Sequence, residues 1–141
     1  MTETQFLLLP AFVHVGLVMV LAMRMGRGRV EAVSRGDVRV NDIALDGSAW
    51  PDDLRKLSNN YSSQFELPVL YYAALALLLA TGFADMMAIA LSWIFVGTRV
   101  VHSLIHTGGN VVVQRFYAFL AGVVFLFLMW AWFGIRLFVI G

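Results

Sequence analysis

Long runs of apolar residues dominate the chain and are separated by shorter polar breaks. Four such runs lie at about residues 4–24, 64–84, 86–106 and 115–136. Each run is close to the roughly 20 helical residues that cross a bilayer core about 30 Å thick. The runs are continuous rather than alternating with a period of two, which favours helices over the strands of a membrane barrel. The pattern therefore predicts one domain, residues 1–141, folded as an all-α, integral membrane four-helix bundle.

The polar residues are concentrated in the connection between the first two runs. We expect residues 25–60 to form a polar cytoplasmic loop, with turn-forming residues in its middle and a helix that starts near Asp52. That helix should project from the membrane before it enters lipid at Glu66. Pro68 follows two positions later and should kink the helix at that point.

Basic residues are distributed unequally between the connections. Only Asp85 is charged in the short connection between the second and third runs, whereas Arg115 follows the break at residues 108–110. The first connection carries or adjoins seven basic residues: Arg24, Arg27, Arg29, Arg35, Arg39, Arg55 and Lys56. Because Lys and Arg in short loops mark the cytoplasmic side, we expect loops one and three to face the cytoplasm. Both termini should then face the opposite side.

The composition supports a membrane location and excludes several chemistries. The chain is 60% hydrophobic and 13% charged, with a mean hydropathy of +0.80. A soluble domain usually carries about twice that charged fraction and could not bury so much apolar surface in one core. The net charge of +1 gives no electrostatic reason to expect nucleic acid as a partner. Because the sequence contains no cysteine, any thiol in the chemistry must arrive with a ligand.

One face of the third run carries three polar residues deep in an apolar segment. Arg99 is followed by His102 and His106 three and seven positions later, so all three share a helical face. A buried charge in a bilayer is costly unless it faces protein or water. We expect a polar pocket that opens to the cytoplasm, with Glu66 as the ion-pair partner of Arg99. The alternative is structural: Arg99 snorkels or pairs with a carboxylate, and the histidines lie near the interface.

Other polar positions are less distinctive. His14 lies near the middle of the first run and is more typical of hydrogen-bonded packing than of ligand binding. A haem between histidines is disfavoured because His14 is central while His102 and His106 are peripheral. We predict no metal site, because the histidine pair lacks the other ligands that zinc requires. The second helix carries two neighbouring polar stripes, one of Asn59, Ser63 and Glu66 and one of Asn60 and Gln64.

Two segments, RVVHSLIHTGGNVVVQRF and NNYSSQFELPVLYY, resemble the MAPEG family, the membrane-associated proteins of eicosanoid and glutathione metabolism. The resemblance covers about residues 54–132, and the form FELPVLYY is similar to a bacterial branch of that family. It implies a homotrimer in a bacterial inner membrane, with glutathione as co-substrate. The glutathione sites would lie between protomers, near the cytoplasmic face.

The resemblance also implies roles for individual residues. The family spacing Arg-x2-His-x12-Arg is met by Arg99, His102 and Arg115. The family residue that matches Arg115 stabilises the glutathione thiolate, so Arg115 is the candidate catalytic residue. The candidate residues for binding glutathione are Arg99, His102, His106, Glu66, Asn60 and Gln64. Guanidinium groups suit this ligand because it has two carboxylates and reacts as a thiolate.

Several positions depart from the family pattern. His106 stands where the family often has a tyrosine, and Phe116 stands where a serine follows the activating arginine. The second-helix motif Arg-Asn-x2-Glu is replaced by Asn60, Tyr61 and Gln64, with Glu66 displaced.

Two functions are therefore open. One is a membrane-embedded, glutathione-dependent transferase or peroxidase that acts on hydrophobic electrophiles. The other is a non-catalytic lipid-binding or scaffold subunit of a membrane complex with the same fold. Membrane lipids and further copies of the chain are expected partners in both cases. A hydrophobic small-molecule substrate belongs to the first function, and other membrane subunits belong to the second.

Overall fold

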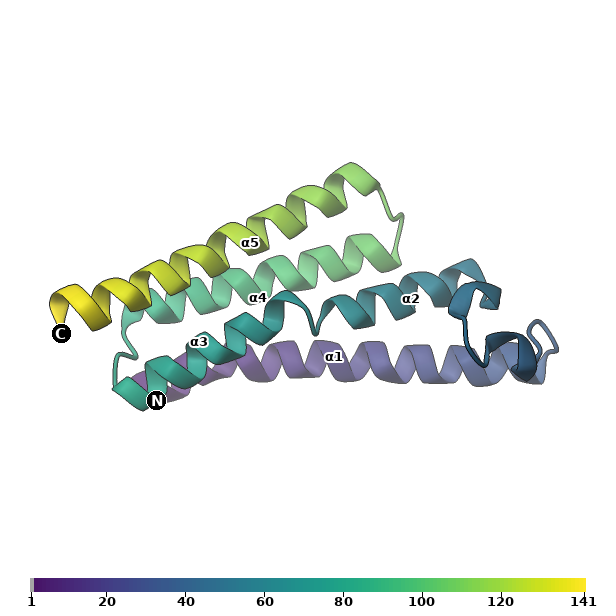
Figure 1. Ribbon diagram of the computed structural model, residues 1–141, viewed down its shortest axis with the longest axis horizontal. Helices are drawn as coiled ribbons and strands as arrows, with labels where there is room; N and C mark the ends of the chain where they lie inside the picture. The colour runs from purple at the N-terminus through teal and green to yellow at the C-terminus, as the bar shows by residue number, and fades with distance from the viewer. Residues whose placement is uncertain (1) are drawn as a thin grey trace.

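Helices make up almost all of the computed structural model, which describes residues 2–141. The long helices are α1 (Glu3–Ser34), α2 (Asp52–Ser63), α3 (Leu67–Thr81), α4 (Met86–Thr107) and α5 (Val112–Ile135). Short 3-10 turns η1 (Val40–Ile43) and η2 (Gly47–Ala49) lie between α1 and α2, and a π turn η3 (Arg136–Ile140) follows α5. Because α2 and α3 follow one another lengthwise, the helices form an elongated four-rod bundle (Figure 1). Both termini lie at one end, and the α1–α2 and α4–α5 connections lie at the other (Figure 1).

Four helical segments are long and apolar enough to cross a membrane. They are Glu3–Ser34, Asp52–Thr81, Met86–Thr107 and Val112–Ile140. Large apolar side chains face outward along them; Phe12 is 71% exposed and Phe127 is 70% exposed. Such a surface suits lipid, which is as apolar as these side chains. The predicted all-α membrane bundle is confirmed.

The first helix extends further than the apolar pattern suggested. A capping box at Thr2 starts it, and the helix continues through residues 25–34, which we expected to belong to the polar loop. This extension is stabilised by contact between α1 and α2 beyond the end of the apolar run. Gly28 has no side chain, and Leu54 of α2 occupies the space where one would lie. The irregular part of the first connection is therefore shorter than expected and contains η1 and η2.

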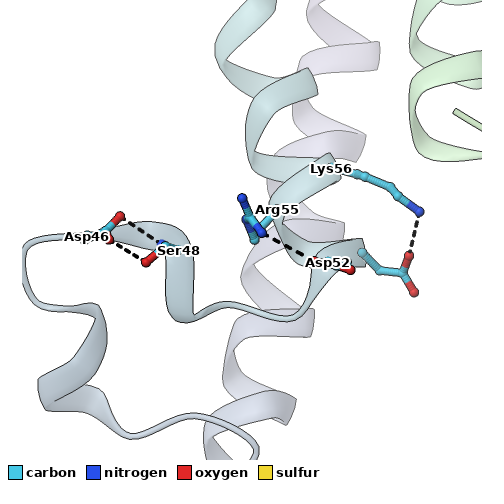
Figure 2. Close-up of polar contacts among 6 residues, drawn as sticks. Asp46, Ser48, Asp52, Arg55 and Lys56 are labelled. Atoms are coloured by element: carbon cyan, nitrogen blue, oxygen red, sulfur yellow. Dashed lines mark hydrogen bonds and ion pairs between the residues drawn. The ribbon is translucent and has the colours of Figure 1, made fainter. Parts of the chain in front are cut away.

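Polar contacts hold this connection against α1 and α2. The Arg29 guanidinium lies over the Trp50 ring, 5.3 Å from its centroid, and donates a hydrogen bond of 2.8 Å to Ser58 Oγ. The Asp46 carboxylate accepts hydrogen bonds from the Ser48 hydroxyl and, at 2.9 Å, from the Ser48 amide (Figure 2). The Ser48 donors hold the pKa of the Asp46 carboxyl below its usual range.

A break at residues 64–66 separates α2 from α3. Helix α2 starts at Asp52, in agreement with the expected start near that residue. Pro68 lies in the first turn of α3, where its missing N–H is tolerated. We expected Pro68 to kink one continuous helix, but the chain is interrupted upstream. The proline ring clashes with the carbonyl four residues earlier in a helix, and that carbonyl belongs to Gln64.

Helix α4 runs between the other helices and carries much of the buried core, including Phe95, which is stacked on Tyr71 at 4.8 Å. Helix α5 approaches it closely at Gly122. A Cβ atom at that position would lie 3.0 Å from Thr98 Oγ1. The opposite flank of α5 faces away from α1 and α3 (Figure 1).

Asp85 closes the end of the bundle that carries both termini. Its Oδ1 accepts a hydrogen bond of 2.9 Å from the Ala88 amide and so caps α4. Its carboxylate also accepts from Trp132 Nε1 at 3.0 Å and lies 3.4 Å from Arg136 Nε. One side chain thus joins the start of α4 to the end of α5.

Candidate functional site

A chain of polar side chains crosses the interior at the level of the α2–α3 break. His14, Gln64 and Arg99 are at most 2% exposed. The Tyr72 hydroxyl lies 2.7 Å from His14 Nδ1, and His14 Nε2 lies 3.1 Å from Gln64 Oε1. Arg99 Nε donates to Gln64 Oε1 at 3.4 Å, and Arg99 Nη2 donates to Ser63 Oγ at 3.0 Å and to the Ser63 carbonyl at 3.1 Å. This chain connects α1, α2, α3 and α4.

The partners assign the proton positions in this network. The Gln64 amide nitrogen donates to the Asn60 carbonyl at 3.1 Å and to Asn60 Oδ1 at 3.0 Å, so the amide oxygen faces His14. A carbonyl oxygen only accepts, which places the His14 proton on Nε2. The neutral imidazole then accepts at Nδ1 from the Tyr72 hydroxyl. Asn60 in turn donates to Ser103 Oγ at 2.6 Å.

The expected ion pair between Glu66 and Arg99 does not form. Within residues 2–141, none of the ion pairs includes Arg99, and Ser63 and Gln64 satisfy its guanidinium instead. The break ends α2 so that Glu66 is exposed while Gln64 faces inward. Arg99, Asn60 and Gln64, which the sequence suggested as ligand-binding residues, therefore lie in the bundle interior.

The remaining predicted residues surround a hollow between α2, α4 and α5, which we call the apolar hollow. It has a volume of about 320 Å³ and is lined by Ser63, Glu66, His102, His106, Val112, Arg115, Phe116 and Phe119. The α5 side of this hollow is apolar, and Phe116 is 57% exposed at its edge. The structure therefore brings Arg115 together with Glu66, His102 and His106.

A second hollow, which we call the polar hollow, adjoins the first. It has a volume of about 210 Å³ and is lined by Asp52, Arg55, Lys56, Asn59, His106, Asn110 and Arg115. His106 and Arg115 line both hollows. They come from the end of α4 and the start of α5, which the break at residues 108–110 places side by side.

Two basic residues of the polar hollow were not identified from the sequence as site residues. Arg55 lies 3.4 Å from Asp52, and Lys56 lies 3.2 Å from Asp53, each within the start of α2 (Figure 2). The two carboxylates are 86% and 92% exposed, so these ion pairs contribute little and leave both cations accessible to a ligand. From the sequence, Arg55 and Lys56 were used only to predict the orientation in the membrane. The signal that could have identified them as site residues is their position on the same helix as the polar stripe of Asn59, Ser63 and Glu66.

Arg115 is held in place at the start of α5. Its Nη1 donates a hydrogen bond of 2.8 Å to Asn110 Oδ1. Asn110 has a φ of 48°, a left-handed conformation that asparagine tolerates better than most residues. The asparagine after the two glycines therefore both turns the chain and orients the guanidinium.

The two histidines of α4 have unused hydrogen-bonding capacity. Their rings meet edge to face with centroids 5.6 Å apart, and His102 and His106 are 5% and 8% exposed. The Nδ1 atom of each ring is buried, and across the described chain neither has a hydrogen-bond partner. Such atoms are uncommon in folded proteins and call for an explanation. His14, by contrast, uses both nitrogens inside the bundle.

Comparison with known proteins identifies the family. No curated protein and no solved structure gives a significant match to the chain. The MAPEG family model matches residues 7–135, which includes nearly all of the four spanning segments. Together with the four apolar helices, this match establishes an integral membrane protein. The resemblance noted in the later part of the sequence thus extends through α1, and the chain belongs to the MAPEG family.

Proposed function

We propose that the protein is a glutathione-dependent transferase or peroxidase that acts on hydrophobic electrophiles dissolved in the membrane. The MAPEG family includes glutathione transferases and peroxidases and generally uses glutathione. One observation carries the proposal: His106 and Arg115 line both a polar and an apolar hollow. A reaction between a water-soluble thiol and a lipid-soluble electrophile needs such a junction.

The polar hollow suits the peptide part of glutathione. The tripeptide carries two carboxylates and one ammonium group, and the hollow offers the cations Arg55 and Lys56 and the anion Asp52. Hydrogen bonds between ionised groups are stronger than those between neutral groups. Asn59 and Asn110 add amide groups that can bind the peptide backbone.

Arg115 is the proposed catalytic residue. The thiolate of glutathione is the reactive form, and a guanidinium beside the sulfur stabilises it. Arg115 lies in the first turn of α5, where the helix N-terminus adds partial positive charge. The electrophile would occupy the apolar hollow beside Phe116 and Phe119.

Calorimetric titration of glutathione into the detergent-solubilised protein tests the proposal. Arg115→Lys should weaken binding about tenfold or more and reduce the ultraviolet absorbance of the thiolate, because lysine lacks the planar donor fork. Arg35→Lys is the matched control. Among residues 2–141 the Arg35 side chain forms only an exposed pair with Glu31 at 3.8 Å, so its replacement should change neither quantity. Equal affinity and equal absorbance in the Arg115→Lys variant would contradict the proposal.

A lipid-binding or scaffold role is the second candidate, and one observation favours it. A third hollow of about 220 Å³, largely apolar, is lined by His14, Val15, Val18, Met19, Gln64, Phe65, Val69 and Tyr72. Mass spectrometry of the purified protein tests this role. A lipid retained in stoichiometric amount and lost in Val69→Trp, with no glutathione binding by the wild type, would replace the enzyme by a lipid-binding protein.

A further inference from the structure

We propose that His106 is the general base that takes the proton from the glutathione thiol, a role that rests on the proposed function. His106 lines both hollows, so its ring lies where the peptide and the electrophile would meet. Its Nδ1 is buried without a partner in the part of the chain that the structure describes and has essentially no surface open to the hollows, so Nε2 is the ring nitrogen that can meet a ligand there. With the imidazole proton on Nδ1, Nε2 carries a lone pair that can accept a proton from a ligand in the hollows.

The neighbouring groups are less suited to the same task. Arg115 stays protonated in proteins and cannot act as a base. Glu66 is exposed and lines the apolar hollow but not the polar hollow. His102 has an equally unpartnered Nδ1 but lines the apolar hollow without reaching the polar one. His106 therefore combines a free acceptor atom with the position that the thiol would take.

The proton transfer balances within the site. The S–H bond breaks, its electron pair stays on sulfur, and the proton forms an N–H bond at His106 Nε2. The products are a thiolate beside Arg115 and an imidazolium, so the net charge of the site does not change. Charged and titratable groups face His106 from three directions: Glu66 near the α2–α3 break, Arg115 on α5, and Asp52, Arg55 and Lys56 on α2, with His102 on its own helix.

Counting protons by calorimetry tests this step. Glutathione is titrated in buffers of different ionisation enthalpy at about pH 8, where an ordinary imidazole is neutral. In the wild type, thiolate absorbance should appear with almost no proton release to the buffer, because the negative charge of the neighbouring thiolate keeps the proton on the His106 imidazolium. In His106→Gln, the thiolate should be lost, or it should form with release of about one proton per site.

Two controls separate the outcomes. S-methylglutathione has no ionisable thiol, so its binding should release no proton in either protein, and it reports whether the variant site is intact. His106→Tyr provides a second variant, since the family often carries tyrosine there and a phenol at this pH cannot accept a proton.

Each result is decisive. Equal thiolate absorbance and equal proton counts in the wild type and both variants would overturn the role of His106 and leave the proposed function standing. Release of a full proton by the wild type would overturn it as well. Failure of the wild type to bind glutathione at all would remove both proposals.

Discussion

Arg99 is a nearly fully buried guanidinium whose direct partners are neutral. It donates to a hydroxyl, a backbone carbonyl and an amide oxygen on Ser63 and Gln64. A buried charge is tolerated only when hydrogen bonds replace its lost hydration. Arg99 therefore stabilises the end of α2, and its contact with Ser63 extends to the wall of the apolar hollow.

A double-mutant cycle distinguishes these partners from the carboxylate that the sequence suggested. Arg99→Leu and Gln64→Leu should show a coupling free energy of about 0.5–3 kcal/mol in a detergent melting series, because the two side chains are in contact. Arg99→Leu combined with Glu66→Leu should show weaker coupling, because no ion pair joins these two side chains within residues 2–141. Strong coupling to Glu66 and none to Gln64 would mean that the hydrogen bonds described here do not hold Arg99.

The sequence predicted which residues share a helical face but not which residues contact one another. Helical spacing correctly placed Arg99, His102 and His106 on one face of α4. Spacing cannot show which neighbour lies opposite each position, so Glu66 was assigned where Gln64 stands. The chain leaves the helix after Ser63, which leaves Gln64 buried and Glu66 exposed.

Among the helices, the contact between α4 and α5 is the one that most directly shapes the site. His106 and Arg115 come from its two sides, and Gly122 sets how closely the helices approach further along. Small residues permit such close approach between membrane helices. The spacing of this pair therefore affects both the stability of the bundle and the width of the apolar hollow.

Gly122→Leu should separate α4 from α5 and lower the free energy of unfolding by about 1–3 kcal/mol, as overpacking in a filled interior does. Gly134→Leu is the matched control on the same helix, because no described atom lies within 4 Å of a Cβ built there. Thermal melting in detergent compares the two variants. Equal melting temperatures would show that the α4–α5 contact at Gly122 is looser than described.

The helices themselves were largely predictable because their apolar runs are long. Their ends were less so, since an end depends on caps and packing rather than on hydropathy. Residues 25–34 continue α1 by packing on α2, and α5 begins at Val112, three residues before the run we expected at 115. Pro68 indicated that the helix would be disturbed. The position of the break, at residues 64–66, depends on the clash between the proline ring and an upstream carbonyl, which a hydropathy pattern does not show.

At the scale of the whole molecule, the two ends of the bundle differ in charge. The end with the α1–α2 and α4–α5 connections holds Arg55, Lys56 and Arg115, whereas the end with both termini has Asp85 paired with Arg136 (Figure 1). We propose a bacterial inner membrane as the location, with the first of these ends in the cytoplasm. The polar hollow would then open toward the compartment that contains soluble thiols.

Reporter fusions test this orientation. A reporter placed at Gly47, in the first connection, should be active in the cytoplasm, and a reporter at Asp85 should be active on the opposite side. Fusions on flanking residues of the same loops control for local disruption. Activity of both reporters on one side would contradict the four-span topology.

We also propose a homotrimer, as the family resemblance implies. Phe116, Tyr117 and Phe127 on α5 are 57%, 63% and 70% exposed, so an apolar flank beside the site is open to a neighbouring copy or to lipid. Mass measurement in mild detergent should give three chains per particle. A stable monomer would restrict any site to the residues of one chain.

The hydrogen-bonded series from Tyr72 to Arg99 also bears on solvent exchange. Asn60 fixes the Gln64 amide, the amide fixes the His14 ring, and the ring fixes the Tyr72 hydroxyl, so one member cannot flip without breaking the next contact. His14 is fully buried near the middle of the predicted first span, so its Nε2 proton has no contact with water. In a deuterated solvent, this proton should therefore exchange as slowly as the core amides of α4, and its nitrogen resonance should remain a single sharp line.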